Sequence, residues 1–333
     1  MMKPAVDYLP TADPLLRHPH LTYSAMPMVL GIEIRVETNS QYVRDLVEDT
    51  FGAWAGRREG EPASPSATPL HVRIVVHDGN EHTAVPSPVR YISTADGRLI
   101  VHSPGSVGIV DESRRESLAY VTAALAGDRE HFRTAVIEAI TFALLACFDR
   151  HPIHAAAIAR DDRAVLLAGP SGTGKSTLAY LAHAAGLTVL SDDRVFVQME
   201  PGLRIWGAPA TARLTAAALP LFPELRDAGV SPAPGNGGKV AVRLTPPNDW
   251  SGQPVSRAVV CVLVRGGRAA LDRMSPASLS AALLSQLSPG FDRFPQRVDR
   301  VVEALTAGGG WRLTLSSDAR ESLPFLRRML ETD

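Results

Sequence analysis

A stretch of eight residues, Gly169–Ser176 (GPSGTGKS), constrains this chain of 333 residues more than any other feature. It fits the pattern of a glycine, four residues and then Gly-Lys-Ser, and it stands between an apolar run and a segment with helical spacing. Glycines let backbone N–H groups converge on phosphate oxygens, and a helix that follows presents its positive end to them. The sequence therefore predicts a strand, a phosphate-binding loop and a helix, in that order.

The loop and the start of the helix supply the residues expected to bind ATP. They are Gly169, Pro170, Ser171, Gly172, Thr173, Gly174, Lys175, Ser176 and Thr177. Lys175 is expected to act in catalysis by reaching the β- and γ-phosphates, and Ser176 to offer its hydroxyl to Mg²⁺. The pattern predicts a nucleotide, whereas the reaction must be inferred from the residues around the loop.

Two adjacent carboxylates, Asp192 and Asp193, end the next apolar strand along the chain. Strand C-termini line the ligand crevice of a doubly wound sheet, so both carboxylates are expected to face the phosphates. One of them can hold Mg²⁺ together with Ser176, and the other can accept a proton from an incoming hydroxyl. We predict Asp192 as the general base and Asp193 as the metal partner.

Two further residues are candidates for the same site. His154 begins a strand expected to form a hairpin with the strand before the loop, so it is either a catalytic residue or a partly exposed strand residue. Lys239, one of only three lysines among 34 basic residues, ends the stretch SPAPGNGGK at 231–239. We expect either a lid that brings Lys239 to a phosphate oxygen or a surface loop whose lysine is solvated.

The pattern of apolar residues predicts two domains. Residues 1–127 are expected to form a small α+β domain rich in antiparallel pairing, with an extended or poorly ordered lead-in at 1–27. A helix capped by Ser40 is expected to end near residue 54. The expected strands lie at 29–36, 70–76, 89–93, 98–102, 107–110 and 118–124. A helix from Asp128 to about residue 148 opens the catalytic domain, 128–333.

The composition of the chain limits the classes of binding partner that we expect. A net charge of −1 provides no basic field for nucleic acid or an anionic membrane. We expect no apolar run close to the roughly 18 residues that span a bilayer, and no secretory signal, so the predicted location is the cytoplasm. The expected partner is a peptide, a small protein or a small-molecule alcohol that accepts the phosphoryl group. A homo-oligomer is possible.

Taken together, the hairpin that His154 begins, GPSGTGKST and VLSDDRVFV resemble the HPr kinase/phosphorylase superfamily. The resemblance covers about residues 132–213, with a weaker likeness in WGAPATARL at 206–214. It implies an α/β fold with a P-loop kinase core of the HPr kinase and phosphoenolpyruvate carboxykinase type, after the α+β domain. It implies protein-serine phosphorylation as the founding activity. The active-site residues that it implies are His154, Lys175, Ser176, Asp192 and Asp193.

The chain departs from that family in two respects. The signature Leu-Gly-Arg-Gly-Ile-Gly, tied to phosphorolysis, does not follow the Asp pair, and the N-terminal domain is different. The chain resembles instead a divergent branch from biosynthetic gene clusters, which includes kinases of a serine in lasso-peptide precursors. We therefore expect an ATP- and Mg²⁺-dependent kinase of a peptide or protein serine. A kinase of a sugar or amino acid, and a non-catalytic nucleotide-binding regulator, remain alternatives.

Overall fold

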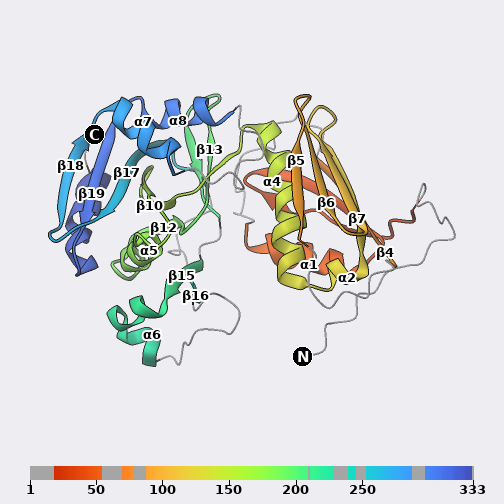
Figure 1. Cartoon of the computed structure of the whole chain (residues 1–333), viewed down its shortest axis with the longest axis horizontal. Coiled ribbons are helices and arrows are strands. Elements are labelled where there is room, and N and C mark those ends of the chain that lie inside the picture. Colours follow the sequence, from red (N-terminus) through yellow and green to blue (C-terminus); the bar gives the residue numbers. More distant parts are fainter. Residues whose placement is uncertain are drawn as a thin grey trace. The chain divides into compact units, whose positions relative to one another are not determined.

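The protein is a mixed α/β structure of two compact units, unit 1 over Met1–Arg150 and unit 2 over His151–Asp333 (Figure 1). The computed structural model describes residues 19–54, 70–78, 88–208, 211–227, 239–244, 253–286 and 297–331. The division falls after Arg150 and not at the expected boundary between residues 127 and 128. The reason is that the long helix after Asp128 packs against the strands of unit 1.

A single sheet runs through the described part of unit 1, in the order β1-β3-β4-β8-β7-β6-β5, with β2 paired to β3. The strands are β1 (Tyr23–Ala25), β2 (Met28–Val29), β3 (Ile32–Thr38), β4 (Leu70–His77), β5 (Arg90–Ser93), β6 (Arg98–Ser103), β7 (Ser106–Asp111) and β8 (Glu116–Thr122). The expected antiparallel pairing holds for β5 to β8. β3, β4 and β8 instead run parallel; helix α1 (Gln41–Phe51) lies in the crossover from β3 to β4, and β5, β6 and β7 lie between β4 and β8 in the chain.

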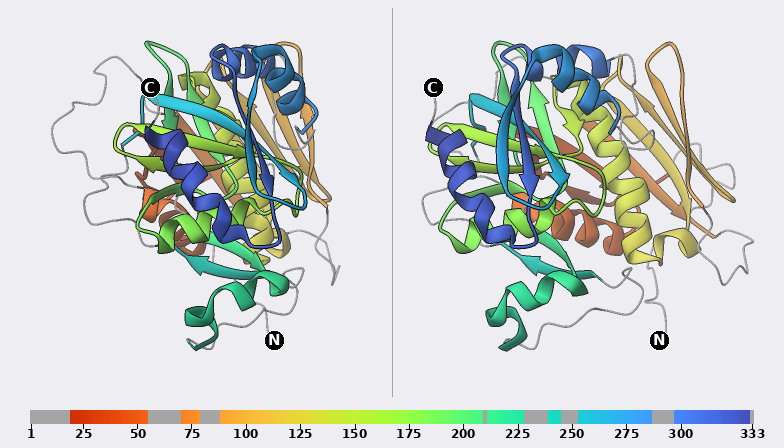
Figure 2. Two further views of the ribbon diagram at one scale, coloured as in Figure 1. Left: turned by 90° about the vertical axis from the view of Figure 1, so that its left-hand side faces the viewer. Right: turned by 60° about the vertical axis from the view of Figure 1, so that its left-hand side comes forward.

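Helices cover one face of this sheet (Figures 1 and 2). Ser40 caps α1 by accepting a hydrogen bond from the backbone N–H of Val43. The other segments are η1 (Gly52–Trp54), α2 (Ala123–Ala126), α3 (Arg129–Phe132), η2 (Arg133–Glu138), α4 (Ala139–Leu145) and η3 (Ala146–Phe148). Edge-to-face and tilted ring contacts among Phe51, Trp54 and Phe142 join α1 to α4. The apolar helix faces are thus buried in the core of unit 1.

The helical run Arg129–Phe148 is long and apolar enough to cross a membrane, judged by length and composition. It is the one such helix among the described residues, and the expectation that no such run exists is therefore wrong. Its most apolar window is 61% buried inside the protein. The core helix of a soluble protein has the same properties, so this run is weak evidence for a membrane span.

The side chain of Asn39 ties the end of β3 to β4. Its amide nitrogen donates to the carbonyl of Val76 and its amide oxygen accepts from the N–H of Val76, both at 2.8 Å, and the residue is buried. Replacing Asn39 by Ala leaves both backbone groups of Val76 without these partners, at about 1–3 kcal/mol for each buried group. We expect Asn39→Ala to lower the free energy of unfolding by about 2–4 kcal/mol in urea denaturation.

The matched control is Glu48→Ala on the exposed side of α1, where the ion pair with Arg44 at 3.6 Å is expected to contribute less than about 1 kcal/mol. Equal destabilisation by the two substitutions would show that Asn39 does not hold the strand ends together.

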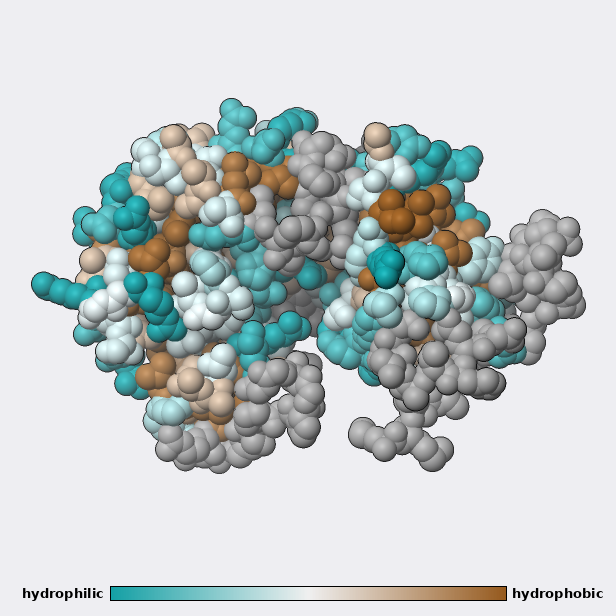
Figure 3. Space-filling model, viewed as in Figure 1, coloured by the Kyte–Doolittle hydropathy of each residue, from teal (hydrophilic) through white to brown (hydrophobic). Residues whose placement is uncertain are grey.

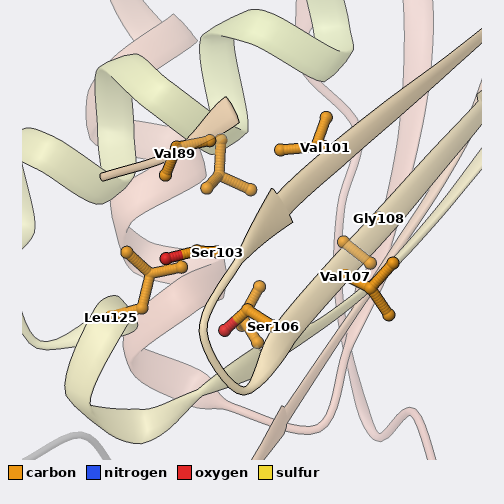
Figure 4. A pocket seen from close by; sticks show the side chains of 10 residues that line it. Val89, Val101, Ser103, Ser106, Val107, Gly108 and Leu125 are labelled. Atoms are coloured by element: carbon orange, nitrogen blue, oxygen red, sulfur yellow. The ribbon is translucent and has the colours of Figure 1, made fainter. Parts of the chain in front are cut away.

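Unit 1 also has an apolar surface and a small cavity. Figure 3 shows apolar side chains over β5 and β6, where Ile92 is 55% exposed, and Val107 and Ile109 on β7 are also exposed. The cavity lies between the sheet and the helices, and valine and leucine side chains line most of it (Figure 4). Of its two serines, Ser106 already accepts a hydrogen bond from the N–H of Thr122. The described residues that line the cavity include no charged side chain.

The central sheet of unit 2 has the order β12-β10-β11-β17-β19-β18. Its strands are β10 (Ala156–Arg160), β11 (Arg163–Ala168), β12 (Thr188–Ser191), β17 (Arg257–Arg265), β18 (Ala270–Met274) and β19 (Gly310–Leu315). β11, β17 and β19 are parallel, β10 is antiparallel to both β11 and β12, and β18 is antiparallel to β19. The strand before the loop and the strand before the Asp pair therefore point the same way.

Alternate residues of these strands fill two cores, one on each face. Helices α5 (Lys175–Ala184) and α9 (Leu323–Glu331) pack over Ile158, Val165 and Leu167. Helices α7 (Pro276–Leu284) and α8 (Val298–Thr306) pack over the opposite face (Figure 2). A short turn, η6 (Ala319–Ser322), precedes α9. Helices thus pack on both faces of the sheet, and the end of β11, where the glycine loop begins, lies between them.

Two smaller sheets complete unit 2. β14 (Arg204–Trp206), β13 (Val195–Gln198) and β9 (His151–Ile153) form one, and β15 (Thr211–Thr215) with β16 (Lys239–Arg243) forms the other. η4 (Ala216–Leu221) and α6 (Pro223–Asp227) follow β15. The hydroxyl of Tyr180 on α5 donates to Glu224 at 3.1 Å, and its ring meets Phe222 edge-on. Helix α5 also contacts β15 directly, which places the β15–β16 pair beside this helix.

Candidate active site

Three segments meet at one edge of the central sheet of unit 2. The loop 169–174 follows the end of β11, Asp192 and Asp193 follow the end of β12, and His154 precedes β10. Because β10 runs antiparallel to both neighbours, its start lies at the edge where they end. Ligands of α/β sheets bind outside the carboxyl ends of the parallel strands, which is this edge.

Glycines shape the loop where other residues would not fit. Gly172 and Gly174 have φ angles of +83° and +119°, in the region that residues with a Cβ rarely adopt. A Cβ on Gly169 would lie 2.8 Å from the hydroxyl of Thr173, which donates to the carbonyl of Pro170. Pro170 and Ser171 are exposed at the tip of the loop, and Ser176 and Thr177 are half-buried in α5. The backbone therefore folds back on itself just before α5.

Lys175 begins α5 and turns its side chain back along the loop. Its Nζ donates to the carbonyl of Gly169 at 2.5 Å and to that of Pro170 at 3.3 Å, and the residue is only 7% exposed. Burial lowers the pKa of Lys175, Asp193 opposes that shift, and the positive charge of Lys239 adds to it. An anion in the loop would therefore meet a poorly solvated ammonium group.

Asp192 is also 7% exposed and is held by a backbone group. The N–H of Arg213 on β15 donates to its Oδ2 at 3.0 Å. Burial raises the pKa of Asp192 to about 6, and the charge of Asp193 adds to the shift, while hydrogen bonds from the Arg213 N–H and the Ser176 side chain oppose it. The carboxylate thus lies against the hydroxyl next to Lys175 and has an increased affinity for a proton.

Asp193 is more open to solvent and faces His154. The Nε2 of His154 is 3.6 Å from Oδ1 of Asp193, whose side chain is 44% exposed. Burial lowers the pKa of His154, Asp193 raises it, and the charges of Lys175, Arg194 and Lys239 lower it further. A neutral imidazole beside the carboxylate is the form that this environment favours.

Lys239 is the first residue of β16, where it pairs with Thr215 of β15. Its positive charge is near enough to affect the pKa values of both Lys175 and His154. The same two-stranded sheet provides the Arg213 N–H to Asp192. The expected lid precedes Lys239, and its residues 231–238 lie outside the described part of the chain.

The donor set fits Mg²⁺ better than a metal held by protein ligands alone. Among the described residues, no group of three or more His, Cys, Asp or Glu side chains could hold a metal ion. Ser176 and the two aspartates instead offer a hydroxyl and carboxylate oxygens in one place. Mg²⁺ commonly binds one or two carboxylates together with waters and substrate phosphates.

Two residues at the candidate site, Arg213 and Arg265, were not predicted from the sequence. Arg213 acts through its backbone N–H, which leaves no signal in a side-chain pattern, although it lies in the stretch WGAPATARL. Arg265 ends β17, and its Nη2 donates to the carbonyl of Gly172 at 3.4 Å. Its position at the end of an apolar strand is a signal that could have indicated it, by the argument used for the Asp pair.

Comparisons with known proteins leave the family of this chain unassigned. No family model and no curated protein matches it. Among solved structures, the chain is similar to the Hpr(Ser) kinase/phosphatase from Coxiella burnetii, with 14% sequence identity and a TM-score of 0.26. The match covers 54% of this chain and 93% of that one. A likeness this slight carries no argument for a shared function.

Proposed function

We propose that unit 2 is an ATP- and Mg²⁺-dependent kinase that transfers the γ-phosphoryl group to the hydroxyl of a serine in a peptide or small protein, in the cytoplasm. The observation that carries the proposal is the buried Asp192 beside Ser176, directly after Lys175 of the glycine loop. A proton acceptor and a phosphate-binding loop are the two parts that a phosphoryl transfer to an alcohol requires.

The loop and the start of α5 would bind the phosphates of ATP. Backbone N–H groups at a helix N-terminus attract anions, and the Lys175 ammonium adds a full positive charge. Ser176 with Asp193 would hold Mg²⁺, which supplies charge neutralisation on the phosphates when it is bound. Lys239 on β16 adds a second ammonium to the surroundings of Lys175. The two ammonium groups balance the two aspartates, so a bound Mg²⁺ would leave a net positive charge for a polyphosphate.

Asp192 would act on the acceptor. It takes the proton of the serine hydroxyl as the oxygen–phosphorus bond forms and the bond to the leaving ADP oxygen breaks. The Arg213 N–H keeps one carboxylate oxygen in place, so the carboxylate stays oriented while it holds the proton. His154 lies near Asp193 and would adjust the position and charge of the Asp193 carboxylate. These roles require no covalent intermediate on the protein.

A transfer assay with γ-labelled ATP and Mg²⁺ tests the proposal. Serine-containing peptide pools and small-alcohol pools are offered separately, and the labelled product is identified by mass spectrometry. Label on a peptide serine is the expected result. Label confined to a small alcohol would overturn the peptide assignment, and ATP binding without transfer to either pool would favour a regulator.

Lys239 gives a more local prediction. If its ammonium contacts a phosphate oxygen, Lys239→Ala removes a charged hydrogen bond of about 1.5–3 kcal/mol and lowers transfer at saturating ATP by about 10- to 100-fold. Arg226→Ala on α6 removes a cation from the same unit and is expected to leave the rate within about twofold. Equal rates for the two variants in the labelled-ATP assay would show that Lys239 is incidental.

A further inference from the structure

Arg265 reaches the loop from the strand next to it. β17 runs parallel to β11, with Val262 paired to Ala168, so the end of β17 lies at the edge where the loop begins. From there the Nη2 of Arg265 donates to the carbonyl of Gly172 at 3.4 Å. The same nitrogen lies 3.7 Å from the place where a Cβ on Gly174 would be. One guanidinium group therefore bonds to the loop at Gly172 and lies close to Gly174.

The contact with the Gly172 carbonyl fixes one peptide plane of the loop. In a trans peptide the C=O and the following N–H point in opposite directions, so a donor on the Gly172 carbonyl sets the direction of the Thr173 N–H. That N–H points into the loop and bonds to the carbonyl of Pro170 at 3.2 Å. Pro170 also accepts from Lys175. Arg265 thus orients the Thr173 N–H toward the Pro170 carbonyl, the same carbonyl that accepts from the Lys175 ammonium.

Arg265 itself is held firmly at its Cα. It pairs with Leu315 at the ends of two parallel strands, and the N–H of the next residue, Gly266, donates to the carbonyl of Leu315 at 2.9 Å. A Cβ on Gly266 would lie 2.4 Å from Cγ2 of Thr314, so the chain turns closely against β19. The guanidinium therefore extends from the rigid sheet to a loop built around glycines.

We propose that Arg265 is a positioning residue that braces the loop 169–174 against the central sheet, an inference that rests on the proposed function. The brace keeps the loop in the shape that binds phosphates before the donor arrives, and a preordered site loses less conformational freedom on binding. Since Arg265 contacts the outer side of a loop peptide, it acts on the affinity for phosphates and not on the transfer step.

The test uses Arg265→Met and Arg265→Lys in the full chain, with Arg268→Met as the control. Arg268 is an exposed arginine in the turn after β17. Three quantities are measured: kcat and KM for ATP, binding of inorganic tripolyphosphate with Mg²⁺, and hydrogen exchange of loop amides without nucleotide. For Arg265→Met we expect KM for ATP and Kd for tripolyphosphate to rise about tenfold each, with kcat within about twofold. Arg265→Lys should recover most of the affinity.

Hydrogen exchange separates failure of the brace from failure of the proposed function. The Thr173 amide is expected to exchange about tenfold faster in Arg265→Met than in the unsubstituted protein, whether or not a nucleotide binds. Unchanged exchange would overturn the brace. A loss of ATP affinity without a loss of tripolyphosphate affinity would also overturn it, since it would indicate contact with the nucleoside. Lack of ATP binding by the unsubstituted protein, with exchange still faster in the variant, would reject the kinase and keep the brace.

Discussion

Replacing Lys175 by Ala is expected to lower phosphoryl transfer by about 10³-fold or more while the fold stays intact. Loss of a preorganised electrostatic donor costs about 10²- to 10³-fold in kcat, and loss of ATP affinity adds to that effect. The ammonium is held by the carbonyls of Gly169 and Pro170. Pro170 keeps the N–H of Thr173 as a donor when the lysine is gone. The loop is therefore expected to keep its backbone conformation.

The comparison variants separate charge from packing. Lys175→Met keeps most of the buried aliphatic chain, so it should be as inactive as Lys175→Ala and closer to the unsubstituted protein in thermal unfolding. Arg160→Ala removes an exposed cation that pairs with Glu331 at 3.0 Å and should leave transfer unchanged. Unchanged turnover in purified Lys175→Ala would reject the nucleotide assignment of the loop.

The sequence predicted the arrangement of these segments well where neighbours in the chain become neighbours in space. The hairpin β10–β11, the loop and α5 are consecutive, and short connections leave few possible arrangements. Asp192 and Asp193 were expected at the same edge because they end the next apolar strand, and the two antiparallel pairings of β10 bring them there. Local patterns were therefore sufficient to place the loop, the Asp pair and His154 together.

Contacts between distant parts of the chain were not predictable in the same way. β4 and β8 of unit 1 pair in parallel although β5, β6 and β7 stand between them in sequence, and no local pattern records that choice. The helix Arg129–Phe148 carries apolar residues around much of its circumference, so its pattern does not reveal which core it enters. Arg213 reaches Asp192 through a backbone N–H, and every residue except proline has one.

Asp192→Asn is expected to lower transfer by about 10²- to 10⁴-fold, the usual effect of losing a general base, with ATP affinity little changed. An amide oxygen still accepts the hydrogen bond from the Arg213 N–H, so the side chain keeps its orientation. The substitution should not reduce stability. Burial raises the pKa of Asp192 to about 6, so ionising this carboxylate at neutral pH costs more free energy in the folded protein than in the unfolded chain, and a neutral amide avoids that cost.

Asp193→Asn is the matched variant, since it makes the same chemical change one residue away. Asp193 is the more exposed carboxylate and lies beside His154, so its loss should raise the Mg²⁺ concentration needed for half-maximal transfer and affect the rate at saturating Mg²⁺ less. Mg²⁺ titrations of both variants decide between the two assignments. The Ser176 side chain lies near Asp192, which is the arrangement expected if Asp192 held the metal instead. If Asp192→Asn shifts the Mg²⁺ dependence and Asp193→Asn abolishes transfer at saturating Mg²⁺, the two roles are reversed.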